Sequence, residues 1–204
     1  MSHIQWISRA VLSGGLALLL AGSVCANGRT TATGNLPQDM SQNKEAPKPM
    51  ATESQIVLAE WNEIGRKIIA IAEDLPEDKY DYKPNPASRS FVGQLLHVSA
   101  CMYYLTDTAQ GQKLRYSEDP SRENLKSKAD IVAFVKKSVE DGATLIKSKG
   151  DKGMSEIITV PYSHQQMHIS DLAYAIAEHS GEHYGQMVVY YRINNMVPPE
   201  SRKN

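Results

Sequence analysis

Apolar residues recur at steps of three and four in four separate segments of this chain. That spacing places them on one face of an α-helix, whose turn takes about 3.6 residues. The four stripes are Val57, Trp61, Ile64, Ile68, Ile71 and Leu75; Phe91, Leu95, Val98, Met102 and Leu105; Ile131, Val135, Val139, Ala143 and Ile146; and Leu172, Ile176, His179, His183, Gln186 and Tyr190. Helices with one apolar face bury it against one another, so we predict an all-α fold, a four-helix bundle over residues 53–201.

Residues that begin or end helices separate the four stripes. The candidate N-caps are Ser88 or Ser90 for the second helix, Ser127 in a capping box with Asp130 for the third, and Ser170 for the fourth. The candidate ends are Pro76, Gly111, Gly150 and Pro198. Residues 156–160 are β-prone, and we expect an extended connector there that need have no sheet partner.

The N-terminal residues 1–26 have the pattern of a secretory signal peptide. Arg9 supplies the positive charge, and the apolar run that follows is too short for a bilayer, which takes roughly 20 residues. Val24-Cys25-Ala26 fits a cleavage site before Asn27. We therefore expect an exported protein, periplasmic or secreted, with no transmembrane helix after cleavage. Lipid anchoring at Cys25 is the less favoured alternative, because Val24 fits poorly before a lipidated cysteine.

Composition bounds the rest of the chain. Residues 27–52 are polar and lack any apolar period, which predicts a disordered linker. The net charge of -1 gives no basic footprint for a nucleic acid, so no such partner is expected. The 204 residues, 41% of them hydrophobic, suit one domain with a substantial core. After signal cleavage Cys101 is the one cysteine left, and we interpret it as a small buried hydrophobic residue.

The fourth stripe changes character halfway along. His179, His183 and Gln186 stand where the pattern calls for leucine or isoleucine, and burying an unpaired polar group costs about 1–3 kcal/mol. A metal ion explains the two histidines, because residues four apart lie one above the other on a helix. His97, beside the second stripe, can supply a third ligand. We predict one divalent metal ion, zinc, nickel or iron, on these three histidines; the alternative is that they are core histidines satisfied by hydrogen bonds.

Two further histidine patterns carry less weight. His164 and His168 are also four apart, but they precede the fourth helix, so we expect them in a loop or on the surface. The run from His179 to His183 matches H-x-x-E-H, the inverted zinc-peptidase signature. That class needs another acidic ligand well downstream, and only Glu200 follows. A zinc peptidase is therefore disfavoured, although Glu182 flanks the predicted site.

Two motifs resemble the DinB-like superfamily, the YfiT-like metalloproteins. His179-Ser180-Gly181-Glu182-His183-Tyr184-Gly185-Gln186, continuing to Val197-Pro198-Pro199, is similar to its last helix. Arg89-Ser90-Phe91 leading to Leu95-Leu96-His97 is similar to its second helix, and the resemblance covers about residues 53–201. It implies a four-helix bundle and a metal site on His97, His179 and His183. Members include thiol-dependent S-transferases and metal-dependent hydrolases, and homodimers are common among them.

Two functions remain open at this point. As an enzyme, the chain would use its metal ion for thiol transfer or hydrolysis of a small molecule. Glu182 or Tyr184 would move the proton, and Gln186 and Tyr190 would line the pocket. As a non-catalytic module, it would bind a metal or a ligand without turnover. The export signal departs from the thiol-transferase members, most of which are cytoplasmic.

Overall fold

The computed structural model describes residues 50–203, and the predicted signal peptide and most of the predicted linker lie outside that range. Four long helices follow one another: α2 (Glu53–Asp74), α3 (Phe91–Ala109), α4 (Lys128–Met154) and α5 (Ile169–Ile193). The shorter elements are the 3₁₀ turns η2 (Glu77–Lys79), η3 (Arg122–Asn124) and η4 (Pro199–Ser201) and the strands β1 (Ile157–Thr159) and β2 (Gln166–His168). Each predicted apolar stripe lies on one of the four helices apart from Leu75, the C-cap of α2, which confirms the helical prediction.

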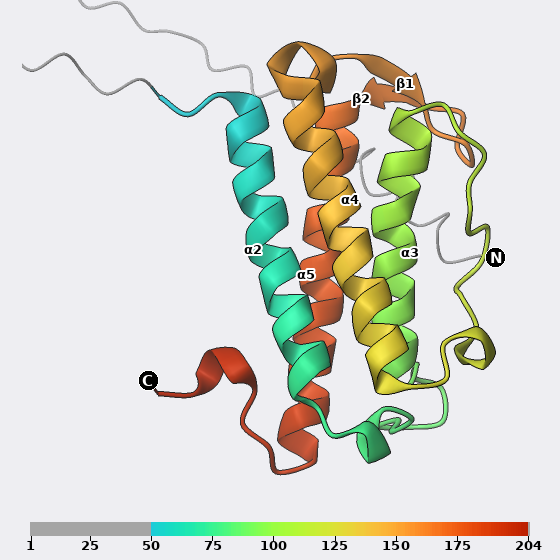
Figure 1. Cartoon of the computed structure of the whole chain (residues 1–204), viewed down its shortest axis with the longest axis vertical. Coiled ribbons are helices and arrows are strands. Elements are labelled where there is room, and N and C mark those ends of the chain that lie inside the picture. Colours follow the sequence, from blue (N-terminus) through green and yellow to red (C-terminus); the bar gives the residue numbers. More distant parts are fainter. Residues whose placement is uncertain (1–49, 204) are drawn as a thin grey trace, which may run out of the picture. The chain divides into compact units, whose positions relative to one another are not determined.

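The helices are not arranged in chain order. α2 and α3 each pack against both α4 and α5, so α2 lies diagonally opposite α3, and α4 lies diagonally opposite α5. In Figure 1, α2 and α5 run down the page while α3 and α4 run up. The neighbours α3 and α4 are therefore parallel. A crossover, residues 110–127, has to return along the length of the bundle to join them.

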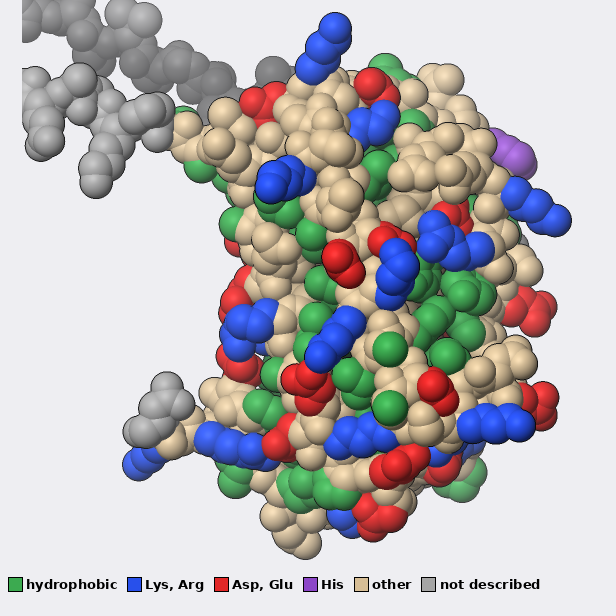
Figure 2. All heavy atoms as spheres, in the orientation of Figure 1, with side chains coloured by type: hydrophobic (Ala, Val, Ile, Leu, Met, Phe, Trp, Pro, Cys, Tyr) green, Lys and Arg blue, Asp and Glu red, His purple; other side chains and the backbone are tan. Residues whose placement is uncertain are grey.

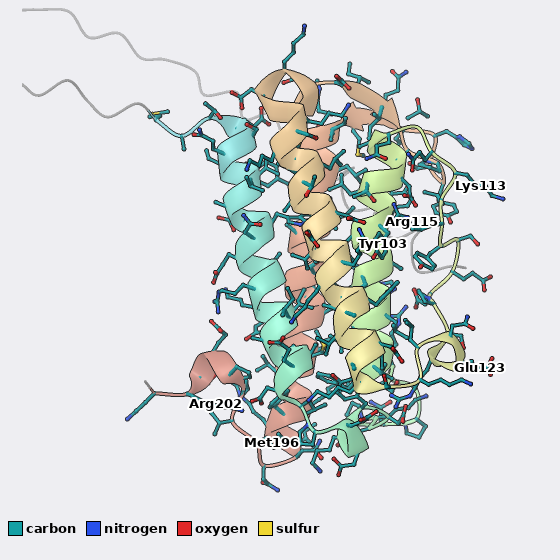
Figure 3. All side chains as sticks on the ribbon, in the orientation of Figure 1. Tyr103, Lys113, Arg115, Glu123, Met196 and Arg202 are labelled. Carbon is teal, nitrogen blue, oxygen red and sulfur yellow. The ribbon has the colours of Figure 1, made fainter. Side chains whose placement is uncertain are left out.

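An ion pair ties the start of this crossover to the end of α3. Asp107 is only 2% exposed, and Arg115 donates to its carboxylate from Nε at 2.9 Å and from Nη2 at 2.6 Å. The guanidinium of Arg115 also lies over the ring of Tyr103, 4.3 Å from its centroid (Figure 3). The crossover is thus anchored where it leaves the helix.

Figure 2 shows charged side chains spread over this face of the bundle, with apolar groups exposed between them.

The helix ends follow the sequence in some places and not in others. Ser90 caps α3 by accepting from the Gly93 amide, and Ser127 caps α4 with Asp130 in the predicted box. The predicted cap Ser170 is wrong: α5 begins at Ile169, and its N-cap is His168, because the strand before it runs directly into the helix. The predicted end at Gly150 is also wrong. This residue has φ +56° and kinks α4, but one more turn follows to Met154.

One further correction concerns the connections. Thr52 is the N-cap of α2, which begins at Glu53. The predicted connector at residues 156–160 has a sheet partner after all, since β1 pairs with β2 as an antiparallel hairpin with Ile157 opposite His168. The partner strand was missed because three residues are too few to show a period. Among the described residues, the structure contains no helix long and apolar enough to cross a membrane.

Candidate metal centre

Three imidazoles meet in the interior between α3 and α5. His97 comes from α3, and His179 and His183 come from successive turns of α5. The Nε2 atom of His179 lies 3.0 Å from Nε2 of His97 and 3.1 Å from Nε2 of His183. The three residues are 1%, 6% and 5% exposed. The structure therefore brings together the three histidines that the sequence singled out.

A carboxylate from the crossover orients His97. Asp119 Oδ1 lies 2.7 Å from His97 Nδ1, and Arg89 Nη2 donates to Asp119 Oδ2 at 3.0 Å. Burial raises the pKa of Asp119, but its hydrogen bond to His97 and the charge of Arg89 lower it more, so the pKa stays below its usual value. An ionised Asp119 can only accept, so the proton of His97 sits on Nδ1. The lone pair on Nε2 then faces the other imidazoles.

A chain of neutral hydrogen bonds orients His183 in the same way. The hydroxyl of Tyr190 donates to the backbone carbonyl of Arg89 at 2.8 Å and therefore accepts from Gln94 Nε2 at 3.1 Å. Gln94 Nε2 also donates to Gln186 Oε1 at 2.8 Å. The remaining oxygen of Gln94, Oε1, lies 2.5 Å from His183 Nδ1 and can only accept. The lone pair of His183 is thus on Nε2.

This donor set fits a metal ion. The Nε2 atoms of His97 and His183 carry lone pairs and both lie within hydrogen-bond distance of the Nε2 of His179, so three possible nitrogen ligands converge on one place. Burial, followed by repulsion from neighbouring cationic groups, lowers the pKa of His179 to about 4 and that of His183 to about 3. Both rings are therefore neutral near pH 7, which is the form that binds zinc, nickel, copper or ferrous iron.

Cys101 belongs to the same group of side chains. Its Sγ atom lies 3.8 Å from His97 Nε2, and the donor atoms of His97, Cys101 and His179 all lie within 4.8 Å of one another. Cys101 is buried as expected, but it faces polar groups as well as the apolar core. Its spacing of four residues from His97 could have pointed to this placement.

The other residues predicted for the site lie around it. Glu182 Oε2 is 3.4 Å from His179 Nδ1, with 42% of its side chain exposed. Gln186 and Tyr190 both contact Gln94, behind His183. Tyr184 lies elsewhere: burial raises its pKa, and the charges that act on it include those of Glu200 and Arg66, in η4 and α2.

The second histidine pair is separate from the trio, as the sequence indicated. His164 is exposed in the turn of the hairpin, and His168 is exposed at the start of α5 with Nδ1 2.8 Å from the Ser155 carbonyl oxygen. Sequence reasoning missed Gln94 and Asp119. Gln94, a polar residue three positions before His97, offered a weak signal, whereas Asp119 in the crossover offered none.

A cavity of about 360 Å³ opens between the crossover and α4. Its wall includes Arg115, Tyr116, Leu125 and Phe134, and it also includes Asp119. Asp119 therefore contacts the cavity on one side and His97 on the other. The volume is in the range that takes a small organic molecule, about 300–1,000 Å³.

The sequence model of the DinB superfamily matches residues 60–187. Solved structures with a similar fold include a DinB-like protein from Bacillus subtilis, with 14% identity, a TM-score of 0.57 and coverage of 73% of this chain and 99% of that one. A DinB-like protein from Bacillus cereus has 16% identity and a TM-score of 0.57, covering 70% of this chain and 93% of that one.

A third similar structure is YfiT from Bacillus subtilis, with 12% identity and a TM-score of 0.57, covering 74% of this chain and 94% of that one. It is described as a probable metal-dependent hydrolase with an unusual four-helix bundle topology. At these identities the likeness establishes the fold alone. No curated protein matches the sequence.

Proposed function

Because this chain belongs to the DinB superfamily, we propose that it binds one divalent metal ion through His97, His179 and His183 and uses it in hydrolysis or group transfer. The observation that carries this proposal is the meeting of three Nε2 atoms, two of them held as lone-pair donors by Asp119 and Gln94. A bound divalent ion supplies Lewis-acid chemistry, which lowers the pKa of water or a thiol and yields a nucleophile near neutral pH.

Of the two candidate proton carriers, Glu182 lies nearer the three histidines, beside Nδ1 of His179. Burial, followed by the charge of Glu178, raises its pKa above the usual value, which is the direction that suits a general acid. Its carboxylate lies beside His179 Nδ1 but remains open to solvent, so protons can enter and leave. We assign the role to Glu182 rather than to Tyr184, which lies towards α2 and η4.

The substrate would be a small molecule, for which the cavity beside Asp119 offers the space. We favour hydrolysis over thiol transfer, because YfiT is described as a probable metal-dependent hydrolase. The second candidate is a non-catalytic metal-binding module. The observation in its favour is Cys101, whose sulfur lies among the imidazoles and could fill an open position of the metal.

Export and pairing are proposed on the sequence and the family resemblance alone. Cleavage before Asn27 would release a periplasmic or secreted protein, and the intact mass of exported protein tests it. A diacylglyceryl group on Cys25 would instead make the chain a lipoprotein. Light scattering on the purified protein would show whether two copies form a homodimer.

Metal analysis with thermal melting tests the proposed centre. Each of His97→Ala, His179→Ala and His183→Ala should lose most of the bound metal. His164→Ala and His168→Ala are matched controls from outside the trio and should keep it. Chelation should lower the melting temperature of the wild type, since a ligand at about 100 times its Kd stabilises the native state by about 2.7 kcal/mol. A wild type without metal, or controls that lose as much metal as the trio, would contradict the proposal.

A further inference from the structure

Cys101 places a thiol on the same face of α3 as His97. The two residues are four apart, so their side chains lie one above the other and point towards α5. Cys101 is fully buried, at 0% exposure, and its sulfur is 3.8 Å from His97 Nε2. Its donor atom groups with those of His97 and His179 within 4.8 Å. A potential fourth ligand therefore lies beside the three imidazoles.

Three of the distances between these donor atoms are close to those between the ligands of one metal ion. With Zn–N near 2.1 Å and Zn–S near 2.3 Å, tetrahedral coordination separates two nitrogens by about 3.4 Å and nitrogen from sulfur by about 3.6 Å. The Nε2 atom of His179 lies 3.0 Å and 3.1 Å from those of His97 and His183. The separation of 3.8 Å from Cys101 Sγ to His97 Nε2 is likewise close to the expected edge.

We propose that Cys101 is a fourth ligand, so that this chain holds its metal ion with three imidazole nitrogens and one thiolate sulfur. The inference rests on the proposed metal centre. When the sulfur–metal bond forms, the S–H proton is released to solvent and no redox change occurs. A thiolate narrows the choice of metal to soft or borderline ions such as zinc, over manganese or magnesium.

A fourth protein ligand also bears on the choice between the two candidate functions. Catalytic zinc sites keep one position for water or substrate, whereas sites with four protein ligands are closed. With Cys101 bound, hydrolysis would need a fifth coordination position or loss of the sulfur. A non-catalytic module would need neither. The ligand set of the resting protein therefore decides how the site can work.

Cobalt(II) is the probe for this inference, because thiolate coordination gives an intense sulfur-to-cobalt charge-transfer band in the near ultraviolet. The full chain is loaded with Co²⁺, and its visible d–d bands report binding to any ligand set. Cys25→Ser is the matched control, since Cys25 is the chain's other cysteine. We expect the band in the wild type and in Cys25→Ser. Cys101→Ala and Cys101→Ser should lose it while keeping the visible bands.

Zinc affinity gives a second readout that does not depend on activity. Competition with a chromophoric chelator should show a loss of more than about tenfold in Cys101→Ala, the lower end of what removal of even an outer-shell partner costs. Co²⁺ bound with visible bands but without the charge-transfer band in the wild type overturns the role of Cys101 and leaves the three-histidine centre standing. A wild type that takes up no metal overturns both. The wild-type spectrum decides this even if a Cys101 variant does not fold.

Discussion

His97 and His183 each donate a hydrogen bond from Nδ1, and their two acceptors differ in strength. His97 donates to a carboxylate, that of Asp119, whereas His183 donates to the neutral amide oxygen of Gln94. An ionised acceptor makes a stronger hydrogen bond and increases the basicity of the ligating nitrogen. Asp119 should therefore matter to metal binding although it contacts no metal itself.

Asp119→Asn should weaken metal affinity by about 10–100-fold, the usual cost of losing the outer partner of a histidine ligand. The variant keeps the shape of the side chain and removes its charge. Glu118→Gln is the control, because it neutralises the neighbouring acid of the same crossover. Competition with a chromophoric chelator measures both. Equal affinities for the two variants would mean that Asp119 does not support His97.

The metal-free protein should lose stability as the pH falls from about 6.5 to about 4. The pKa of His179 is lowered to about 4 and that of His183 to about 3, chiefly by burial, while an unfolded histidine titrates near 6.5. In this range the unfolded chain binds protons that the folded chain does not, so unfolding is favoured. Urea titrations at a series of pH values would show the slope. His183→Gln should flatten it, and an unchanged slope would count against the assignment.

At the scale of elements, α2 and α4 approach each other closely over two residues without a side chain. A Cβ atom at Gly142 would lie 2.0 Å from Cζ2 of Trp61, and one at Gly65 would lie 2.4 Å from Cγ1 of Val139. The indole N–H of Trp61 also donates to the backbone carbonyl of Val139 at 2.9 Å. These contacts fix the two helices against each other along their buried faces.

Gly142→Ala should destabilise the protein by about 1–3 kcal/mol, because the added methyl group has no space beside a fully buried indole. Gly185→Ala, in α5, is the matched control: no atom lies within 4 Å of its Cβ position. The control should gain up to about 1 kcal/mol from the higher helix propensity of alanine. Chemical denaturation measures both changes, and a Gly142→Ala variant as stable as the wild type would show that the helices can shift apart.

At the scale of the whole molecule, the arrangement of the helices makes the metal site depend on the crossover between α3 and α4. Because α3 and α4 are parallel neighbours, the chain must return along the bundle between them. That crossover begins at the ion pair of Asp107 and Arg115 and carries Asp119 back to His97 near the start of α3. The topology therefore supplies the partner of one metal ligand.

Arg115→Ala should lower stability by about 3 kcal/mol, since it removes the guanidinium from the buried carboxylate of Asp107 and leaves it the backbone amide of residue 115. It should also weaken metal binding, because the crossover that holds Asp119 loses its anchor. Lys113→Ala is the control, an exposed cation in the same crossover (Figure 3). Denaturation and chelator competition would be measured together. Normal metal affinity in a destabilised Arg115→Ala variant would show that the ion pair stabilises the fold but does not hold Asp119 at the metal site.

The helices and their buried faces could be predicted from the sequence because both depend on residues close together in the chain. Steps of three and four identify an apolar face such as that from Val57 to Leu75, and local side chains set caps such as Ser90 and Ser127. Elements without a period were misjudged. The three-residue strand β1 found its partner only after a turn, and the kink at Gly150 did not end α4.

For the site, the sequence by itself determined which histidines stand out, because His179 and His183 interrupt an apolar stripe at the spacing of one helical turn. Only the tertiary structure decided what surrounds them. It brought Gln94 to His183 through the packing of α3 against α5, and it brought Asp119 to His97 through the crossover. Such contacts depend on which helices are neighbours, and local spacing carries no information about that.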